Sequence, residues 1–209
     1  MSYSFRLGRL FGIPIYLHIS WFIIFALVTL SLSRIYFPSL YPNWSSGLYL
    51  IVGVATSLLF FASVVAHELT HSLVSRLNGI PVKSITLFIF GGVARITREA
   101  GKPMAELVMA AAGPASSLVI AGLFGLLWWL AGPHSEPISA LAGWLGGINI
   151  ALAVFNMIPG FPLDGGRVLR SLIWRLTGNY KRATRLASLA GRGVGYTLIT
   201  VGILWAVFT

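Results

Sequence analysis

Apolar residues occur in five long runs along the chain, separated by short polar or glycine- and proline-containing stretches. A transmembrane helix needs about 20 predominantly apolar residues. The runs predict such helices at residues 14–33, 47–78, 104–131, 138–158 and 193–209. We therefore expect an all-α polytopic membrane protein with about five to six transmembrane helices, folded as a single domain over residues 1–209.

The pattern changes at residues 80–97, which are rich in β-branched and aromatic residues and are broken by Gly91 and Gly92. This predicts a small membrane-associated β-hairpin or sheet after the second helix. An open strand edge there could accept an extended peptide as an added strand, which makes Gly91, Gly92 and Val93 candidate substrate-binding residues. The pattern fits a purely structural hairpin equally well.

A basic segment follows the fourth apolar run. Seven Lys and Arg residues are spaced along apolar ones over residues 167–192, a pattern typical of an amphipathic helix on a membrane surface. We place this interfacial helix at residues 166–177. The basic start of the chain precedes an apolar run longer than the core of a signal peptide, so we interpret that run as a retained first span.

Composition supports the membrane assignment. Of the 209 residues, 56% are hydrophobic and only 10% are charged, against about 25% charged in soluble domains. The net charge of +10 does not indicate nucleic acid, because no basic stripe is interleaved with exposed aromatics. With a cytoplasmic N-terminus, 14 of the 15 Lys and Arg fall on the cytoplasmic side, as the positive-inside rule requires. The prediction is a multi-pass cell-membrane protein with its functional site toward the cytoplasm.

Few side chains in the sequence can bind a metal or act as nucleophiles. The chain has no cysteine, so thiolate ligands, disulfides and thiol nucleophiles are excluded, and a metal must be held by His, Asp or Glu. Five acidic residues occur, and Asp164 is the single aspartate.

The sequence His67-Glu68-Leu69-Thr70-His71 lies near the end of the second apolar run. On a helix, positions i and i+4 share a face, so His67 and His71 can bind one metal ion, with Glu68 within reach of a metal-bound water. Two histidines bonded to neighbouring groups would be the structural alternative. Ionisable groups in a membrane segment need partners, and a divalent cation would satisfy all three.

A second informative stretch runs from Asn156 to Arg167, where two prolines and two adjacent glycines break the fourth helix. It presents Asp164, which could simply cap the next helix. Zinc hydrolases use three protein ligands and leave a fourth position open, so we favour Asp164 as the third ligand, ahead of Glu106. We interpret His18 and His134 as unrelated to the metal.

The two stretches together resemble the site-2 protease family of intramembrane zinc metalloproteases, peptidase family M50, as do the start FGIPIYLHIS, the GGVARI region and the AAAGP helix. The resemblance implies that His67, His71 and Asp164 bind one Zn²⁺ and that Glu68 is the general base. Asn156 would bind substrate or the oxyanion, and Pro159 is a further candidate substrate-binding residue. Many relatives of this family continue into a sixth span and a CBS-type regulatory domain, so we expect this chain to be a membrane core.

The expected function is a zinc-dependent intramembrane endopeptidase that cleaves transmembrane segments of protein substrates in the lipid bilayer. Zinc would activate water, and Glu68 would take its proton and deliver it to the leaving amine. The alternative is a membrane transporter that uses His67, Glu68, His71 and Asp164 as an ion pathway. A catalytically silent zinc-binding scaffold is a second alternative.

Overall fold

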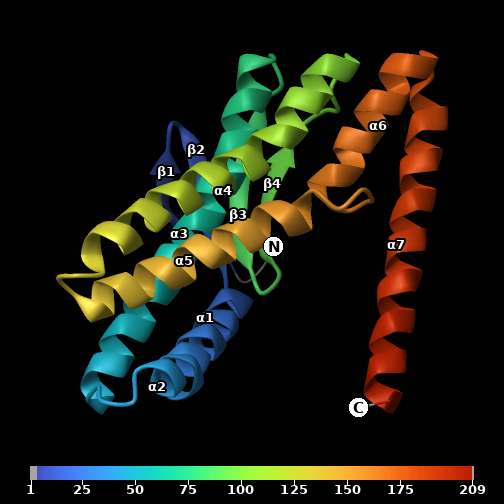
Figure 1. The fold of residues 1–209 in the computed structure, drawn as a ribbon. Coiled ribbons are helices and arrows are strands. Elements are labelled where there is room, and N and C mark those ends of the chain that lie inside the picture. Colours follow the sequence, from blue (N-terminus) through green and yellow to red (C-terminus); the bar gives the residue numbers. More distant parts are fainter. Residues whose placement is uncertain (1–3, 209) are drawn as a thin grey trace.

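The computed structural model describes residues 4–208 as a helical bundle that carries a small sheet (Figure 1). The strands are β1 (Ser4–Leu10), β2 (Ile13–His18), β3 (Val82–Phe88) and β4 (Gly91–Ile96). The helices are α1 (Ser20–Ser31), a π-helical turn η1 (Leu32–Tyr36), α2 (Phe37–Leu40), α3 (Ser46–Leu77), α4 (Pro103–Ala131), α5 (Glu136–Asn156), α6 (Asp164–Thr177) and α7 (Tyr180–Phe208).

Within residues 4–208, five helices are long and apolar enough to cross a membrane. They are Ser20–Leu40, Ser46–Leu77, Pro103–Ala131, Glu136–Asn156 and Tyr180–Phe208. The three middle helices agree with the predicted runs, and the Ser45 side chain caps α3 by accepting from the Leu48 N–H. The predicted fold class, a polytopic helical protein with a small sheet, is confirmed.

Both outer spans differ from the prediction. The first helix begins at Ser20 rather than residue 14, because residues 13–18 form β2 instead. The last helix begins at Tyr180 rather than residue 193, so the basic segment is divided between α6 and the start of α7. The division occurs at Gly178, whose φ of 65° ends α6 in the left-handed conformation that glycine adopts readily.

The predicted hairpin is present, but it is half of a larger sheet. Four strands pair in the order β1-β2-β3-β4. The two hairpins are antiparallel, and β2 and β3 join them in parallel through pairs such as Ile15 with Ile85. Ile13, Leu69 and Ile85 form a buried cluster between this sheet and α3. The sheet is thereby fixed along the half of α3 that carries the histidines.

The helix α4 packs against α3, α5 and α6, and places these elements around one point. Several buried hydroxyls on α3 bond to carbonyls of their own helix, as Thr56 does to Val52 and Ser75 does to His71. The N-terminal part of α7 packs against α6 and against the turn at Gly160 and Phe161, whereas its C-terminal part stands apart from the bundle (Figure 1).

Candidate metal centre

The helix α3 carries both histidines and Glu68 in its second half, on the side that packs against α4 and the sheet. His67 is 3% exposed and His71 is 5% exposed. Their ring centroids lie 4.8 Å apart, as the four-residue spacing requires. Two imidazoles are therefore buried side by side at the end of a membrane-spanning helix.

Asp164 meets both rings from the start of α6. Its Oδ2 atom lies 3.2 Å from His67 Nε2 and 3.0 Å from His71 Nε2, and the two Nε2 atoms are 3.2 Å apart. Atoms that surround a zinc ion tetrahedrally at about 2.0–2.2 Å are roughly 3.3–3.6 Å from one another. The three donors are thus already close to the spacing that a zinc site needs.

The outer nitrogens of both rings are held by α4. The Nδ1–H of His71 donates to the Met109 carbonyl over 2.6 Å, and His67 Nδ1 lies 2.9 Å from Ser117 Oγ. Because a carbonyl can only accept, this bond places the His71 proton on Nδ1 and leaves Nε2 free to bind a metal. Such outer contacts orient histidine ligands in metalloproteins.

Gly113 lies between Met109 and Ser117 on the same face of α4. A Cβ at Gly113 would lie 2.6 Å from His67 Nε2 and still closer to His71 Nε2. The α4 backbone therefore borders the point where the donors converge, and only a hydrogen atom fits there.

Glycines also bring Asp164 into place. A Cβ on Gly166 would lie 2.5 Å from the backbone nitrogen of Phe161, and one on Gly165 would meet the carbonyls of Met157 and Ile158. The start of α6 can pack onto the turn after α5 because both positions lack side chains. The N-cap of α6 is Leu163, so Asp164 is the first helical residue rather than the cap. Burial opposes ionisation of its carboxyl, but the two histidines lower its pKa to about 2.

Glu106, the weaker ligand candidate, lies outside the cluster of His67, His71 and Asp164. It is 1% exposed and pairs with Arg170 of α6, whose Nε donates to Glu106 Oε1 over 2.8 Å. The Arg170 guanidinium also lies over the Phe161 ring, with 5.0 Å to its centroid. This ion pair joins α4 to α6 within two turns of Asp164.

A cavity of about 360 Å³ opens beside Glu68. Of the predicted site residues, His67, Glu68, Gly91, Gly92 and Asn156 line it, whereas Val93 and Pro159 do not. A Cβ on Gly92 would lie 2.5 Å from Glu68 Cγ, so β4 runs directly against this carboxylate. The Asn156 side-chain amide donates to the Leu152 carbonyl over 2.9 Å.

Two histidines are separate from this site, as expected. His18 Nδ1 lies 2.8 Å from Ser20 Oγ at the start of α1, and His134 is exposed in the turn after α4. The sequence analysis did not identify His67 as the partner of Ser117 or Glu106 as the partner of Arg170. The signal for Ser117 was its position four residues after Gly113, on the face that meets the histidines.

Comparison with known proteins places this arrangement in a family. The model of peptidase family M50 matches residues 55–136 and 132–198, which include both histidines, Glu68 and Asp164. The chain belongs to peptidase family M50. This confirms the family resemblance identified from the two motifs.

Relatives agree with this assignment. The chain is 49% identical to "Putative zinc metalloprotease sll0528" from Synechocystis over 98% of its own length, and 40% identical to "Putative zinc metalloprotease Rip3" from Mycobacterium tuberculosis over 97%. It spans about half the length of these curated relatives. The solved site-2 protease from Methanocaldococcus jannaschii matches with a TM-score of 0.65 and 31% identity, over 98% of this chain and 87% of that one.

The donor set fits the zinc that these names imply. The Nε2 atoms of two histidines converge with one carboxylate oxygen of Asp164. The helix α4 orients the His71 ring, and the absence of a side chain at Gly113 leaves space beside the donor atoms. This is the two-histidine, one-carboxylate set of several zinc hydrolases.

Proposed function

We propose that this M50 chain is a zinc-dependent endopeptidase that cleaves membrane-spanning segments of protein substrates. The observation that carries the proposal is the convergence of His67, His71 and Asp164 next to a cavity that Glu68 also lines. His67, His71 and Asp164 would hold the zinc. A bound zinc ion lowers the pKa of water to about 7 and polarises a carbonyl.

Glu68 would serve as the general base. It follows His67 in α3, and its carboxylate faces the cavity beside β4. From there it can accept the proton of the attacking water and pass it to the nitrogen of the leaving amine. The peptide bond is thereby broken without a covalent intermediate on the protein.

Asn156 would orient the scissile carbonyl. A side-chain amide has two N–H donors, and the Leu152 carbonyl accepts only one of them. The second can donate to a carbonyl oxygen in the cavity, where charge develops during attack. Pro159 lies in the turn that follows and would act only by holding this segment in place.

The substrate would bind as an added strand on β4. This strand is at one end of the four-stranded order and pairs on one side only, with β3. Gly91 and Gly92 line the cavity and would let a substrate backbone approach Glu68 closely. An intact transmembrane helix hides its carbonyls in its own hydrogen bonds, so pairing with Gly91, Gly92 and Val93 would hold the unwound segment extended.

The proposed orientation places the N-terminus and the site on the cytoplasmic side of the cell membrane. The support is the distribution of Lys and Arg, which places 14 of 15 on one side of a five-span topology. Water for hydrolysis would reach the cavity from that side, because α3 carries the histidines toward the same end.

The test uses the full chain in lipid nanodiscs with a quenched fluorescent transmembrane peptide. We expect cleavage that a zinc chelator stops and added zinc restores. Glu68→Gln should bind zinc as the wild type does and lose at least about 100-fold in rate, the low end for a general base. Zinc binding without cleavage in the wild type, together with ion flux into liposomes, would instead indicate the transporter.

A further inference from the structure

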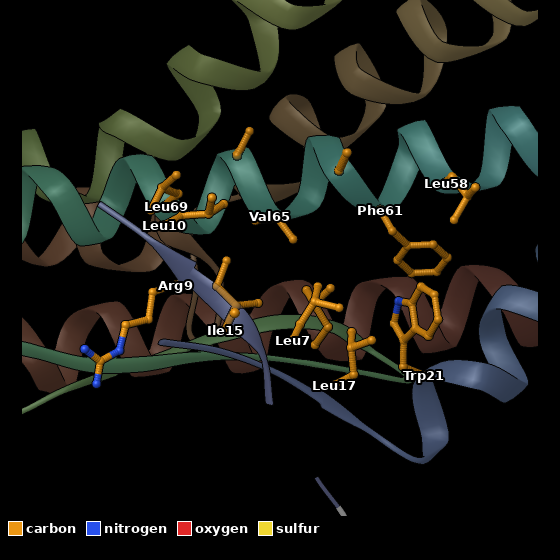
Figure 2. A pocket seen from close by; sticks show the side chains of 14 residues that line it. Leu7, Arg9, Leu10, Ile15, Leu17, Trp21, Leu58, Phe61, Val65 and Leu69 are labelled. Atoms are coloured by element: carbon orange, nitrogen blue, oxygen red, sulfur yellow. The ribbon is translucent and has the colours of Figure 1, made fainter. Parts of the chain in front are cut away.

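The candidate metal centre has an apolar flank and a polar flank. Between β1 and α3 lies a groove of about 520 Å³ that is lined mainly by aliphatic and aromatic side chains, such as Val65 and Leu69 (Figure 2). Such side chains offer no hydrogen bond to a histidine or an aspartate. The polar support of the two histidine rings comes from the other flank, from Ser117 and the Met109 carbonyl of α4.

The same face of α4 also carries Glu106. This residue is three positions before Met109 and seven before Gly113, spacings that place residues on one side of a helix. Glu106 Oε1 accepts from Arg170 Nε of α6 over 2.8 Å and also from Arg170 Nη2. Both side chains are buried, with Glu106 1% and Arg170 8% exposed. One face of α4 thus holds α3 through the histidines and α6 through a buried ion pair.

Arg170 also contacts the turn that leads into α6. Its guanidinium carbon lies 5.0 Å from the ring centroid of Phe161 and 4.9 Å from that of Tyr180, within the range of cation–π contacts. Phe161 packs closely on the first turn of α6, because a Cβ on Gly166 would lie only 2.5 Å from its backbone nitrogen. Tyr180 is the first residue of α7, and its hydroxyl donates to Glu99. One buried side chain therefore joins α4, α6, α7 and the turn.

The position of Asp164 depends on the elements that Arg170 joins. Within residues 4–208, the hydrogen bonds of the Asp164 carboxylate are those with His67 and His71, so no further side chain orients it. Its place is set by the backbone of α6, of which it is the first residue. Arg170 is six positions later on the same helix, about 9 Å at 1.5 Å per residue. A shift of α6 at Arg170 would therefore move Asp164 as well.

We propose that Arg170 is the positioning residue for Asp164, and this inference rests on the proposed function, in which Asp164 is the third zinc ligand. Arg170 fixes α6 against the α4 face that orients the histidines, and so sets the distance from Asp164 Oδ2 to both Nε2 atoms. Metal–ligand distances tolerate only about ±0.2 Å. Lysine cannot replace Arg170, because an ammonium group lacks the planar fork that bonds a carboxylate and stacks on a ring together.

The test replaces Arg170 by lysine in the full chain in detergent, which keeps a positive charge beside Glu106. We expect zinc affinity, measured by competition against a chromogenic chelator, to fall about 10- to 100-fold, the effect of losing outer support of a metal ligand. Co²⁺ bound in place of zinc absorbs visible light with an intensity that depends on coordination geometry, and this absorption should change. Arg175→Lys is the matched control, because Arg175 is exposed on the same helix, and it should behave as the wild type does.

A second variant acts on the ring rather than on the ion pair. Phe161→Leu keeps the bond between Arg170 and Glu106 and removes the ring beside the guanidinium. It should lower zinc affinity about two- to fivefold, the equivalent of one exposed cation–π contact. Because it introduces no polar group, it remains informative if Arg170→Lys folds poorly.

Hydrogen exchange of the zinc-free chain tests the same contact without a metal. The Leu163 N–H donates to the Gly160 carbonyl, and the Gly166 N–H donates to the Leu163 carbonyl. Exchange at these two amides therefore reports how firmly the turn and the start of α6 are held. Arg170→Lys should speed exchange there severalfold and leave the amides of α5 unchanged.

Wild-type zinc affinity and cobalt absorption in a folded Arg170→Lys protein would overturn the proposal. So would an equal loss of affinity in Arg175→Lys, or faster exchange throughout α3, α4 and α5, which would indicate general destabilisation rather than misplacement of Asp164. Failure of the wild type to bind zinc would refute the proposed function instead. The exchange measurement needs no zinc and would still decide whether Arg170 holds the start of α6.

Discussion

Replacing Gly113 by alanine should weaken zinc binding strongly, although none of the three proposed ligands is substituted. The added methyl group would lie 2.6 Å from His67 Nε2 and closer still to His71 Nε2, about 0.8 Å or more inside an ordinary carbon–nitrogen contact of roughly 3.4 Å. The α4 backbone fixes the position of this methyl group, so no side-chain rotation can move it away from the rings. The histidine rings must move instead.

Their movement is opposed by the same helix. Ser117 and the Met109 carbonyl hold the two Nδ1 atoms at 2.9 and 2.6 Å, one turn on either side of Gly113. Zinc–ligand distances tolerate about ±0.2 Å, and the required shift is several times larger. We expect zinc affinity to fall at least about 100-fold, the upper end of the effect of losing an outer contact to a metal ligand.

The assay is competition for zinc against a chromogenic chelator, measured on the full chain in detergent, with peptide cleavage as a second reading. Gly122→Ala is the matched control, because it lies on the same helix and its added Cβ would meet no atom within 4 Å. Both variants gain the same helix preference of alanine over glycine. Wild-type zinc affinity in Gly113→Ala would refute the inference that α4 borders the metal position.

Further predictions concern the supports of the site. Ser117→Ala should lower zinc affinity about 10- to 100-fold, because His67 loses the hydrogen-bond partner of its Nδ1 atom. Ser116→Ala is the control, because its hydroxyl bonds to its own helix, and it should leave zinc affinity unchanged. Equal effects of the two variants in chelator competition would show that Ser117 does not orient His67. Glu106→Gln should cost up to about 3–5 kcal/mol of stability, because the buried Arg170 guanidinium loses its nearest carboxylate and keeps only Glu99, at 3.7 Å. The measurement is the melting temperature, which should fall. Glu99 is the more distant partner of Arg170 and its side chain is 68% exposed, so Glu99→Gln should change the melting temperature little. A larger fall in Glu99→Gln than in Glu106→Gln would contradict the assignment of Glu106 as the main partner.

Local patterns in the sequence were sufficient to predict the three middle helices and the grouping of the candidate ligands. Helical spacing brings His67 and His71 together regardless of the rest of the fold. Asp164 was the single aspartate of the chain, and glycines next to it allowed the close packing that brings it to the histidines. The structure brings these three residues together as predicted.

Features that depend on distant partners could not be predicted in this way. Residues 14–18 were predicted as the start of a helix, because their strand partner β3 lies about 70 positions later and pairs with them in parallel. The division between α6 and α7 depended on one glycine with positive φ. Glu106 was a candidate metal ligand in the sequence, and its ion pair with Arg170, 64 positions away, could be seen only in the structure.

The 97 positions that separate His67 from Asp164 have a consequence for biosynthesis. As the chain leaves the ribosome, the histidine pair enters the bilayer well before the aspartate has been translated, and two further helices must be inserted in between. Under the proposed function, the nascent protein would lack the third zinc ligand while it is still beside the translocation machinery. The proposed hydrolysis would begin only once α6 packs against α4 and brings Asp164 to the histidines, so the order of translation would itself protect neighbouring proteins.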